Sequence, residues 1–146
     1  MRIRRAMLED MPTLAALHRH TLHMSLPFLP TLHTPDEDRA WFRDHLFPNN
    51  EVWVAEDEAG ALLGYAARAQ GWLNHIYVHP DHQGRGVGDA LLAMAKGGID
   101  TLQLWTFQEN AHARRFYEKR GLVLAELTDG LRNEEKSPDA RYVWTR

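Results

Sequence analysis

The sequence predicts one α/β domain over residues 1–146, with a mixed central sheet of about six to seven strands and about four flanking helices. The main observation is that short apolar segments typical of strands alternate with longer segments of helical spacing. The second is the length, which is that of one ordinary domain without internal repeats or linker-like tracts. Hydrophobic residues make up 44% and charged residues 25% of the chain, as in average globular proteins, which excludes disordered and fibrous classes.

The first third of the chain predicts a strand and two helices. The strand covers Arg2 to Ala6, and Glu9 or Asp10 can cap the helix that follows, with Pro12 in its first turn. Helical spacing places four apolar residues on the inner side of this helix: Met11, Leu14, Leu17 and Met24. A second helix is expected to begin at Thr34-Pro35 and to run toward Leu46.

The middle of the chain predicts an antiparallel meander. Its strands are residues 52–56, 61–68 and 73–78, which are rich in apolar and aromatic side chains and are separated by turn signals. The third strand leads into a glycine-rich loop and then into a helix that ends at Gly97-Gly98.

The last third predicts a strand at residues 102–107, a helix from Asn110 to Arg120 and a strand at 122–127. A polar loop follows from Thr128 to Arg141, and residues 142–144 are predicted to form a final edge strand.

Composition excludes several functional classes. The net charge of −3 with mixed signs argues against a nucleic-acid binder. The chain has no cysteine, which excludes disulfides, thiolate metal sites and a cysteine nucleophile. Neither a signal peptide nor a membrane span is evident, so we expect a cytoplasmic protein that does not bind a membrane.

The glycine-rich loop in HPDHQGRGVGDALLAMAK admits two interpretations. Gly84, Gly86 and Gly88 could simply form a flexible turn. Alternatively, free N–H groups and the positive end of the helix dipole could bind an anion such as pyrophosphate, with Gln83 and Arg85 as further donors. The Walker and dinucleotide patterns both fail, because Asp89 and Ala90 follow Gly88.

The spacing that does fit is QGRGVG, which resembles the Q/R-x-x-G-x-G/A pattern of the GCN5-related N-acetyltransferases (GNAT), whose loop holds the pyrophosphate of acetyl-coenzyme A (acetyl-CoA). LNHIYVHPDHQGRGVGDALL is similar to the family's fourth strand, loop and following helix. LWTFQENAHARRFYEKRGL is similar to its fifth strand and next helix, except that Leu122 replaces a phenylalanine. The resemblance covers about residues 73–122 and implies the GNAT fold.

The resemblance implies a cofactor site in these segments. The pantetheine arm would pair with the backbone of Ile76, Tyr77 and Val78, and the N–H near Val78 would polarise the thioester carbonyl. The pyrophosphate would lie on the loop residues Gln83, Gly84, Arg85, Gly86, Val87, Gly88 and Asp89. The helix motif adds Asn110, Ala113, Phe116 and Tyr117 to the cofactor-binding set.

Tyr117 matches the tyrosine that the family commonly uses as the acid for the departing thiolate, although a tyrosine on an amphipathic helix can also simply pack. Asn110 can cap its helix and also contact the pantetheine or acetyl region. Arg114, Arg115 and Arg120 could form a solvated face, or one of them could reach the phosphates.

The general base is less defined by the sequence. Some family members carry a glutamate on the fifth strand where this chain has Trp105. Asn74 and His75 lie near the predicted separation of the strands but point to opposite faces, so His75 or a chain of waters is the candidate base.

The acceptor region carries no readable motif. His18, His20, His23 and His33 are expected to lie on the surface or to line a pocket, and His18 and His20 do not share a helix face, so no metal site is expected. Four apolar residues could line an acceptor site or pack over the sheet: Met24, Leu26, Phe28 and Leu29. Glu134, Glu135 and Asp139 could attract a cationic amine or form a solvated acidic loop.

The leading hypothesis is an acetyl-CoA-dependent N-acetyltransferase that acts directly on a primary amine of a small molecule or peptide, without a metal. The alternative is a non-catalytic acyl-CoA sensor or interaction module on the same fold. A nucleotide-binding function is a third possibility, against which the failed motifs count. The acceptor stays open because loop specificity has no sequence code, and a homodimer through the last strand is expected only from the resemblance.

Overall fold

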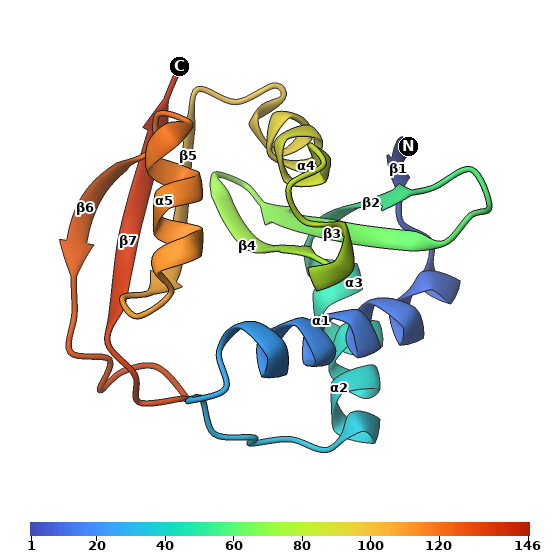
Figure 1. Cartoon of the computed structure of the whole chain (residues 1–146), viewed down its shortest axis with the longest axis horizontal. Helices are drawn as coiled ribbons and strands as arrows, with labels where there is room; N and C mark the ends of the chain where they lie inside the picture. The colour runs from blue at the N-terminus through green and yellow to red at the C-terminus, as the bar shows by residue number, and fades with distance from the viewer.

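The computed structural model describes residues 1–146 and contains one seven-stranded mixed sheet in the order β1-β2-β3-β4-β5-β7-β6 (Figure 1). The strands are β1 (Arg2–Arg5), β2 (Glu51–Glu56), β3 (Leu62–Ala69), β4 (Trp72–Val78), β5 (Thr101–Phe107), β6 (Val123–Leu127) and β7 (Asp139–Thr145). The predicted α/β fold is therefore confirmed, including the antiparallel meander of β2, β3 and β4.

The helices are α1 (Met11–Ser25), α2 (Pro35–Trp41), α3 (Phe47–Asn49), α4 (Val87–Lys96) and α5 (Ala111–Lys119). A π-helical turn over Phe42–Leu46 joins α2 to α3, so the single helix predicted after Thr34 is a continuous helical segment with a π-helical turn inside it. Thr34 begins it with a capping box, in which its side chain accepts a hydrogen bond from the Glu37 N–H.

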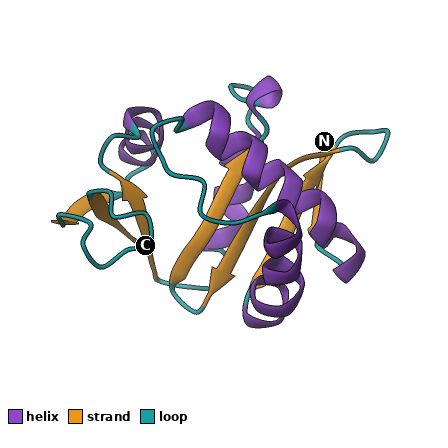
Figure 2. Cartoon of the chain, turned by 90° about the horizontal axis from the view of Figure 1, so that it is seen from below, coloured by secondary structure: helices purple, strands orange, loops and turns teal.

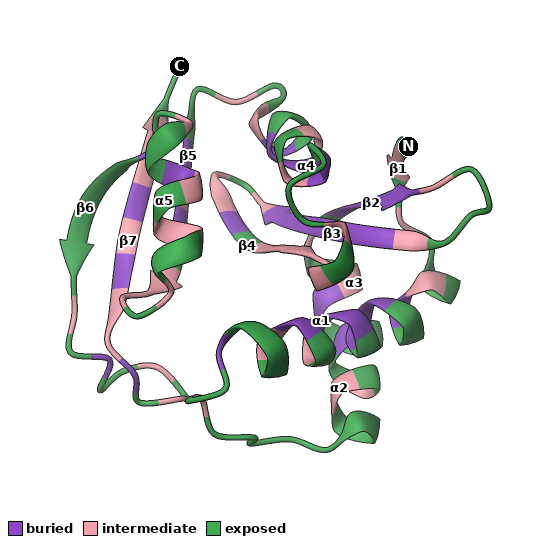
Figure 3. Ribbon diagram, viewed as in Figure 1, coloured by how far each residue is buried: buried purple, intermediate pink, exposed green.

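Helices cover both faces of the sheet (Figures 1 and 2), because strand residues point alternately to the two sides. On β2, Val52 and Val54 pack with Leu14 of α1. The intervening Trp53 packs in a second core with Leu91 of α4. Figure 3 shows the buried residues of the β2–β3 region between these helices.

The sheet is weakly joined in its middle. β4 and β5 run parallel, and their only register pair is Trp72 with Gln103, beside a hydrogen bond from the Gln103 N–H to the Gly71 carbonyl of 2.8 Å. Beyond that pair the two strands diverge toward their carboxyl ends (Figure 1). The facing edges of β4 and β5 therefore remain free of strand partners where the strands separate.

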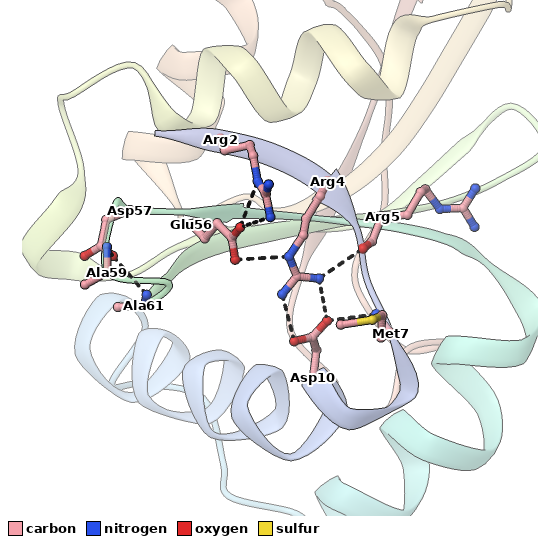
Figure 4. Close-up of polar contacts among 9 residues, drawn as sticks. All are labelled: Arg2, Arg4, Arg5, Met7, Asp10, Glu56, Asp57, Ala59 and Ala61. Carbon is pink, nitrogen blue, oxygen red and sulfur yellow. Dashed lines mark hydrogen bonds and ion pairs between the residues drawn. The ribbon is translucent and has the colours of Figure 1, made fainter.

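The N-terminal strand is held by a cluster of charges (Figure 4). The Arg4 guanidinium donates to Glu56 at 3.0 Å and to Asp10 at 2.9 Å, and these bonds lower the pKa of both carboxyl groups. Asp10 is the residue before α1, as predicted, but its carboxylate does not cap this helix. It accepts instead from Arg4 and from the Met7 N–H.

Three predictions about the fold are wrong. The last strand is not an edge strand: β7 pairs with β5 along its whole length and with β6 on its other side, so β6 forms the edge (Figure 3). β7 also begins earlier than expected, at Asp139. Met24 is 63% exposed, because it lies at the rim of the buried face of α1, on which Leu14 and Thr21 are central.

Candidate functional site

The glycine-rich loop presents a row of free backbone donors. No backbone N–H from Gln83 to Asp89 donates a hydrogen bond within the chain, and the first helical bond here runs from Ala90 to the Gly86 carbonyl. Gly84 and Gly86 have φ values of 76° and 83°, the left-handed region that favours glycine. Unpaired N–H groups at the start of α4 form a concave site suited to phosphate oxygens.

Gly88 serves a different purpose from the other two loop glycines. A Cβ atom at this position would lie 3.0 Å from the Phe116 ring of α5, whereas at Gly84 and Gly86 it would meet nothing within 4 Å. The absence of a side chain at Gly88 therefore lets α5 pack closely against α4 beside the loop. Sequence spacing alone does not separate this packing role from phosphate binding.

A cavity of about 330 Å³ opens where β4 and β5 separate. Most of the predicted cofactor-binding residues line it: Ile76, Tyr77, Val78, Gln83, Gly84, Gly88, Asn110, Ala113, Phe116 and Tyr117. The structure thus brings together the two sequence segments that carry the family motifs.

Four predicted cofactor residues do not line this cavity with their side chains. Val87 is buried in the core under α4, and Asp89 forms an ion pair with Arg120, which lowers the pKa of Asp89. Arg85 lies near His82, and Gly86 has no side chain to contribute. Val87 and Asp89 can therefore contact a ligand at the loop through their backbone N–H groups and not through their side chains.

The carboxyl end of β4 offers main-chain groups to the cavity. The His79 N–H donates to the Leu63 carbonyl of the neighbouring strand at 2.8 Å. Because hydrogen-bonding directions alternate along an antiparallel strand, the N–H groups of Ile76 and Val78 point the other way, toward β5. The Gln83 side chain donates to the Val78 carbonyl at 3.1 Å and so ties the loop to the strand end.

Tyr117 lies in the wall of the cavity and is 7% exposed. Its hydroxyl makes no hydrogen bond within the chain, in contrast to the Tyr142 hydroxyl, which donates to Glu118 at 2.6 Å. Burial, with a smaller effect of Tyr77, raises the pKa of Tyr117 above its usual value. The phenol is therefore protonated at neutral pH and free to donate to a ligand.

Asn110 caps α5 as predicted, since its side-chain oxygen accepts a hydrogen bond from the Ala113 N–H at 3.1 Å. The arginines of the next turns serve the fold. Arg114 donates to the Tyr142 hydroxyl at 3.0 Å, and Arg120 is bound to Asp89 and to the Phe116 carbonyl.

Asn74 and His75 point to opposite sides of β4, as strand alternation predicts. Asn74 lines the 330 Å³ cavity and donates to the Asn50 side chain at 2.9 Å. His75 does not line that cavity: its ring packs against Tyr65 and Trp41 on the α1 side of the sheet. Its nearest link to the cavity is Tyr77, which lines the cavity and whose ring centroid lies 5.6 Å from that of His75.

Two further cavities adjoin α1 and α2, of about 120 and 480 Å³. Both are lined by His18, His33, Asp38, Glu134 and Glu135. The tail acids therefore do reach a cavity, with the exception of Asp139, which is bound to Thr128 and Asn133. The smaller cavity shares Leu22 and Leu26 with the cavity between β4 and β5.

Of the four apolar residues near the end of α1, two line a cavity as expected and two have neither expected role. Leu26 is buried and lines two cavities, and Leu29 lines the smaller one. Phe28 and Met24 are exposed.

The site includes residues that sequence reasoning missed. Thr21, Leu22 and Ser25 come from the last turns of α1, and Thr106 and Phe107 from the end of β5. Thr21 is 4% exposed, and its hydroxyl has no hydrogen-bond partner. A buried threonine hydroxyl without a partner is a signal only the folded chain reveals, because helical spacing alone marks Thr21 as an ordinary inner residue.

The profile of the Acetyltransferase (GNAT) domain family matches residues 48–122, just over half of the chain. This chain belongs to the GNAT family. The peptidyl-lysine N-acetyltransferase YiaC of Escherichia coli K12 is 28% identical over 125 residues, which cover 85% of this chain and 84% of YiaC. The GNAT protein described here is accordingly an acetyl-CoA-dependent acetyltransferase that acts on an amine-type substrate.

Solved structures agree with the GNAT fold. The apo-form of YjaB from Escherichia coli superposes with a TM-score of 0.81 at 22% identity, over 98% of this chain and 96% of YjaB. YncA from Salmonella typhimurium, solved with its cofactor acetyl-CoA, superposes with a TM-score of 0.72 at 21% identity, over 99% of this chain and 93% of YncA.

Two further observations concern other ligands and surroundings. No group of three or more histidine, aspartate or glutamate side chains in the GNAT protein is arranged to hold a metal ion. None of its helices combines the length and apolarity that crossing a bilayer requires. The cytoplasmic location and the homodimer stay predictions, and β7 has no free edge through which a dimer could form.

Proposed function

We propose that this GNAT protein transfers acetyl directly from acetyl-CoA to a primary amine on a small molecule or a peptide, with residues of the β4–β5 cavity in the roles given below. One observation carries the proposal. The free N–H groups of the Gln83–Asp89 loop and the free hydroxyl of Tyr117 are both found at the single cavity formed where β4 and β5 separate.

The chain fits acetyl-CoA at both ends of this cavity. The loop N–H groups would donate to the pyrophosphate, and the unpaired edge of β4 at Ile76 and Val78 would hydrogen-bond the pantetheine amides in the manner of an added strand. Acetyl-CoA supplies the activated acetyl group and a thiolate leaving group. The Val78 N–H would donate to the carbonyl oxygen of the thioester, on which negative charge develops during attack.

Tyr117 would hold the proton that the departing thiolate needs. A phenol with a raised pKa stays protonated at neutral pH, so Tyr117 can donate a hydrogen bond to the thiolate as it departs. If the proton is transferred, the phenolate is a stronger base than the thiolate and regains a proton from water. The chain has no cysteine to carry an acyl intermediate, which favours direct attack by the amine. The acceptor amine would bind in the cavities beside α1.

A peptide amine is among the acceptors that the comparisons favour, because YiaC is named for peptidyl-lysine. The carboxylates Glu134 and Glu135 beside the acceptor cavities suit an approaching cationic group.

Calorimetric titration tests the proposal first. We expect acetyl-CoA to bind with one site per chain, and ATP and NAD to bind far more weakly because neither carries the pantetheine arm that pairs with β4. A colorimetric assay of free coenzyme A with lysine peptides, spermidine and amino acids then tests transfer. Equal binding of ATP and acetyl-CoA would contradict the assignment of the cavity.

A further inference from the structure

Two imidazoles meet on one buried phenol on the α1 side of the sheet. The Tyr65 oxygen lies 3.0 Å from Nδ1 of His18 and 2.8 Å from Nδ1 of His75. Tyr65 is fully buried on β3, and it connects a histidine of α1 with a histidine of β4. The predicted role of His75 as a general base does not involve its hydrogen bond to Tyr65.

Because Tyr65 has only one phenol proton, its two hydrogen bonds to the histidines must differ: it donates in one and accepts in the other. A phenol has one proton to donate and lone pairs to accept with. When both rings are neutral, one histidine therefore donates its Nδ1–H to the Tyr65 oxygen, and the other accepts the Tyr65 proton at Nδ1. The two histidines consequently hold opposite tautomers, and a shift of both protons along the chain exchanges them.

The two ends of the chain have different surroundings. His18 lines both cavities beside α1 and α2, together with Asp38, Glu134 and Glu135, and its ring meets the edge of Tyr77 at 4.6 Å. Tyr77 lines the cavity between β4 and β5. His75 is half-buried and its ring stacks on the exposed Trp41, with 5.7 Å between the ring centroids.

We propose that His18, rather than His75, receives the proton of the acceptor amine, and that Tyr65 relays a proton onward to His75. This inference rests on the proposed function. As nitrogen attacks the acetyl carbon, an amine proton passes to Nε2 of His18, and the Nδ1 proton of His18 moves to the Tyr65 oxygen. The Tyr65 proton moves to Nδ1 of His75, and the Nε2 proton of His75 leaves to water. No net charge remains in the protein.

Burial explains why a relay suits this site better than a single base. Burial lowers the pKa of His18 to about 4 despite Asp38, and burial together with His18 lowers the pKa of His75 well below its usual value. Burial raises the pKa of Tyr65. Each of the three groups resists ionisation, so a linked shift that creates no buried ion avoids the cost of charging any one of them.

The test combines activity with a direct view of the tautomers. Single-turnover acetylation by Tyr65→Phe is measured with a lysine peptide, spermidine and L-amino acids as probes, in water and in heavy water. We expect a rate about 100-fold below wild type, unchanged acetyl-CoA affinity, and loss of a solvent isotope effect that in wild type involves more than one proton. His18→Gln should give the same loss, whereas His20→Gln, on the exposed side of α1, should leave the rate unchanged.

Nitrogen-15 NMR of histidine-labelled protein supplies a readout that does not depend on turnover. We expect His18 and His75 to show opposite tautomers in wild type and to lose this pairing in Tyr65→Phe. If Tyr65→Phe binds acetyl-CoA and retains both the rate and the isotope effect, or if the two histidines share one tautomer, the relay is wrong. If wild type binds no acetyl-CoA or acetylates none of the probes, the proposed function fails, and the relay with it.

Discussion

The two sides of the proposed site offer different kinds of group to a ligand. On the coenzyme side, the loop from Gln83 to Asp89 and the edge of β4 offer main-chain N–H groups. On the acceptor side, the cavities beside α1 and α2 are lined by histidine and carboxylate side chains that come from three distant segments. Main-chain groups are the same for every residue, so a main-chain site can stay constant across a family while a side-chain site changes its ligand.

The largest expected effect lies where the two sides meet. Tyr117→Phe should lower kcat by about 100-fold, because the departing thiolate loses its proton donor. The affinity for acetyl-CoA should hardly change, since the ring that lines the cavity is retained. Stopped-flow assays and calorimetry on the same preparation check both values. Turnover equal to wild type would remove Tyr117 from the proton transfer.

The next largest effect should be confined to the coenzyme side. Gly88→Val places a branched side chain where even a Cβ atom would be 3.0 Å from Phe116, so α5 must move away from α4 and the cavity changes shape. We expect acetyl-CoA affinity to fall by about tenfold, equivalent to about 1.4 kcal/mol. Gly88→Ala should fall between wild type and Gly88→Val. Equal affinities for all three proteins would show that the contact is unimportant for binding.

A smaller effect, on stability alone, is expected when the ion pairs of Arg4 are removed, which connect β1 with Asp10 and with Glu56 of β2. Arg4→Met removes both ion pairs, and the unfolding midpoint should fall by about 2 to 4 °C at neutral pH. Arg4 lowers the pKa of Asp10 in the folded protein. The stabilisation is therefore present above the unfolded pKa of about 4 and is lost as the pH falls through the lower folded pKa.

Thermal melts of both proteins across the acid range check this linkage. The midpoints of wild type and Arg4→Met should converge as the pH falls. A difference that is as large in acid as at neutral pH would mean that Arg4 stabilises the chain through packing of its stem and not through its charge.

The smallest effect is expected from Glu135, whose side chain lines the cavities on the acceptor side. Burial, and to a smaller extent the charge of Glu135, raises the pKa of Tyr77 to about 12, so Glu135 lies near enough to influence the charge of a ligand beside Tyr77. Glu135→Gln should raise KM for a cationic amine by about two- to threefold at low salt, with no change for acetyl-CoA, and salt should abolish the difference. Glu58→Gln, on the β2–β3 turn, is the matched control. A salt-independent change would point to a shape effect.

The coenzyme side could be predicted from the sequence in most respects, and the acceptor side could not. Glycine spacing and the Asn110 to Tyr117 motif marked residues that the fold brings to one cavity, because both segments are local and their spacing is preserved in three dimensions. The His18–Tyr65–His75 contact depends on how α1 packs over β3 and β4. Sequence periodicity says which face a residue occupies but not which residue of another element it meets.

The errors in the fold prediction share a physical cause. The order of β6 and β7 depends on the pairing of β7 with β5, a contact between segments more than thirty residues apart, and the apolar pattern of β7 fits an inner or an outer position. Met24 lies at the rim of the buried face of α1, where the spacing of apolar residues does not decide whether a side chain is covered. In both cases the local pattern was compatible with two outcomes, and contacts with other elements decided between them.

The single register pair between β4 and β5 has a consequence for motion. Two halves of a sheet joined at one point lack the ladder that normally makes strands open together, so amides near the divergence should exchange with deuterium sooner than those of β2 and β3. A pantetheine arm that lies between β4 and β5 would hydrogen-bond to the strands and hold the two halves of the sheet together. Acetyl-CoA would then slow exchange on both strands at once, and the bound protein would unfold as one unit.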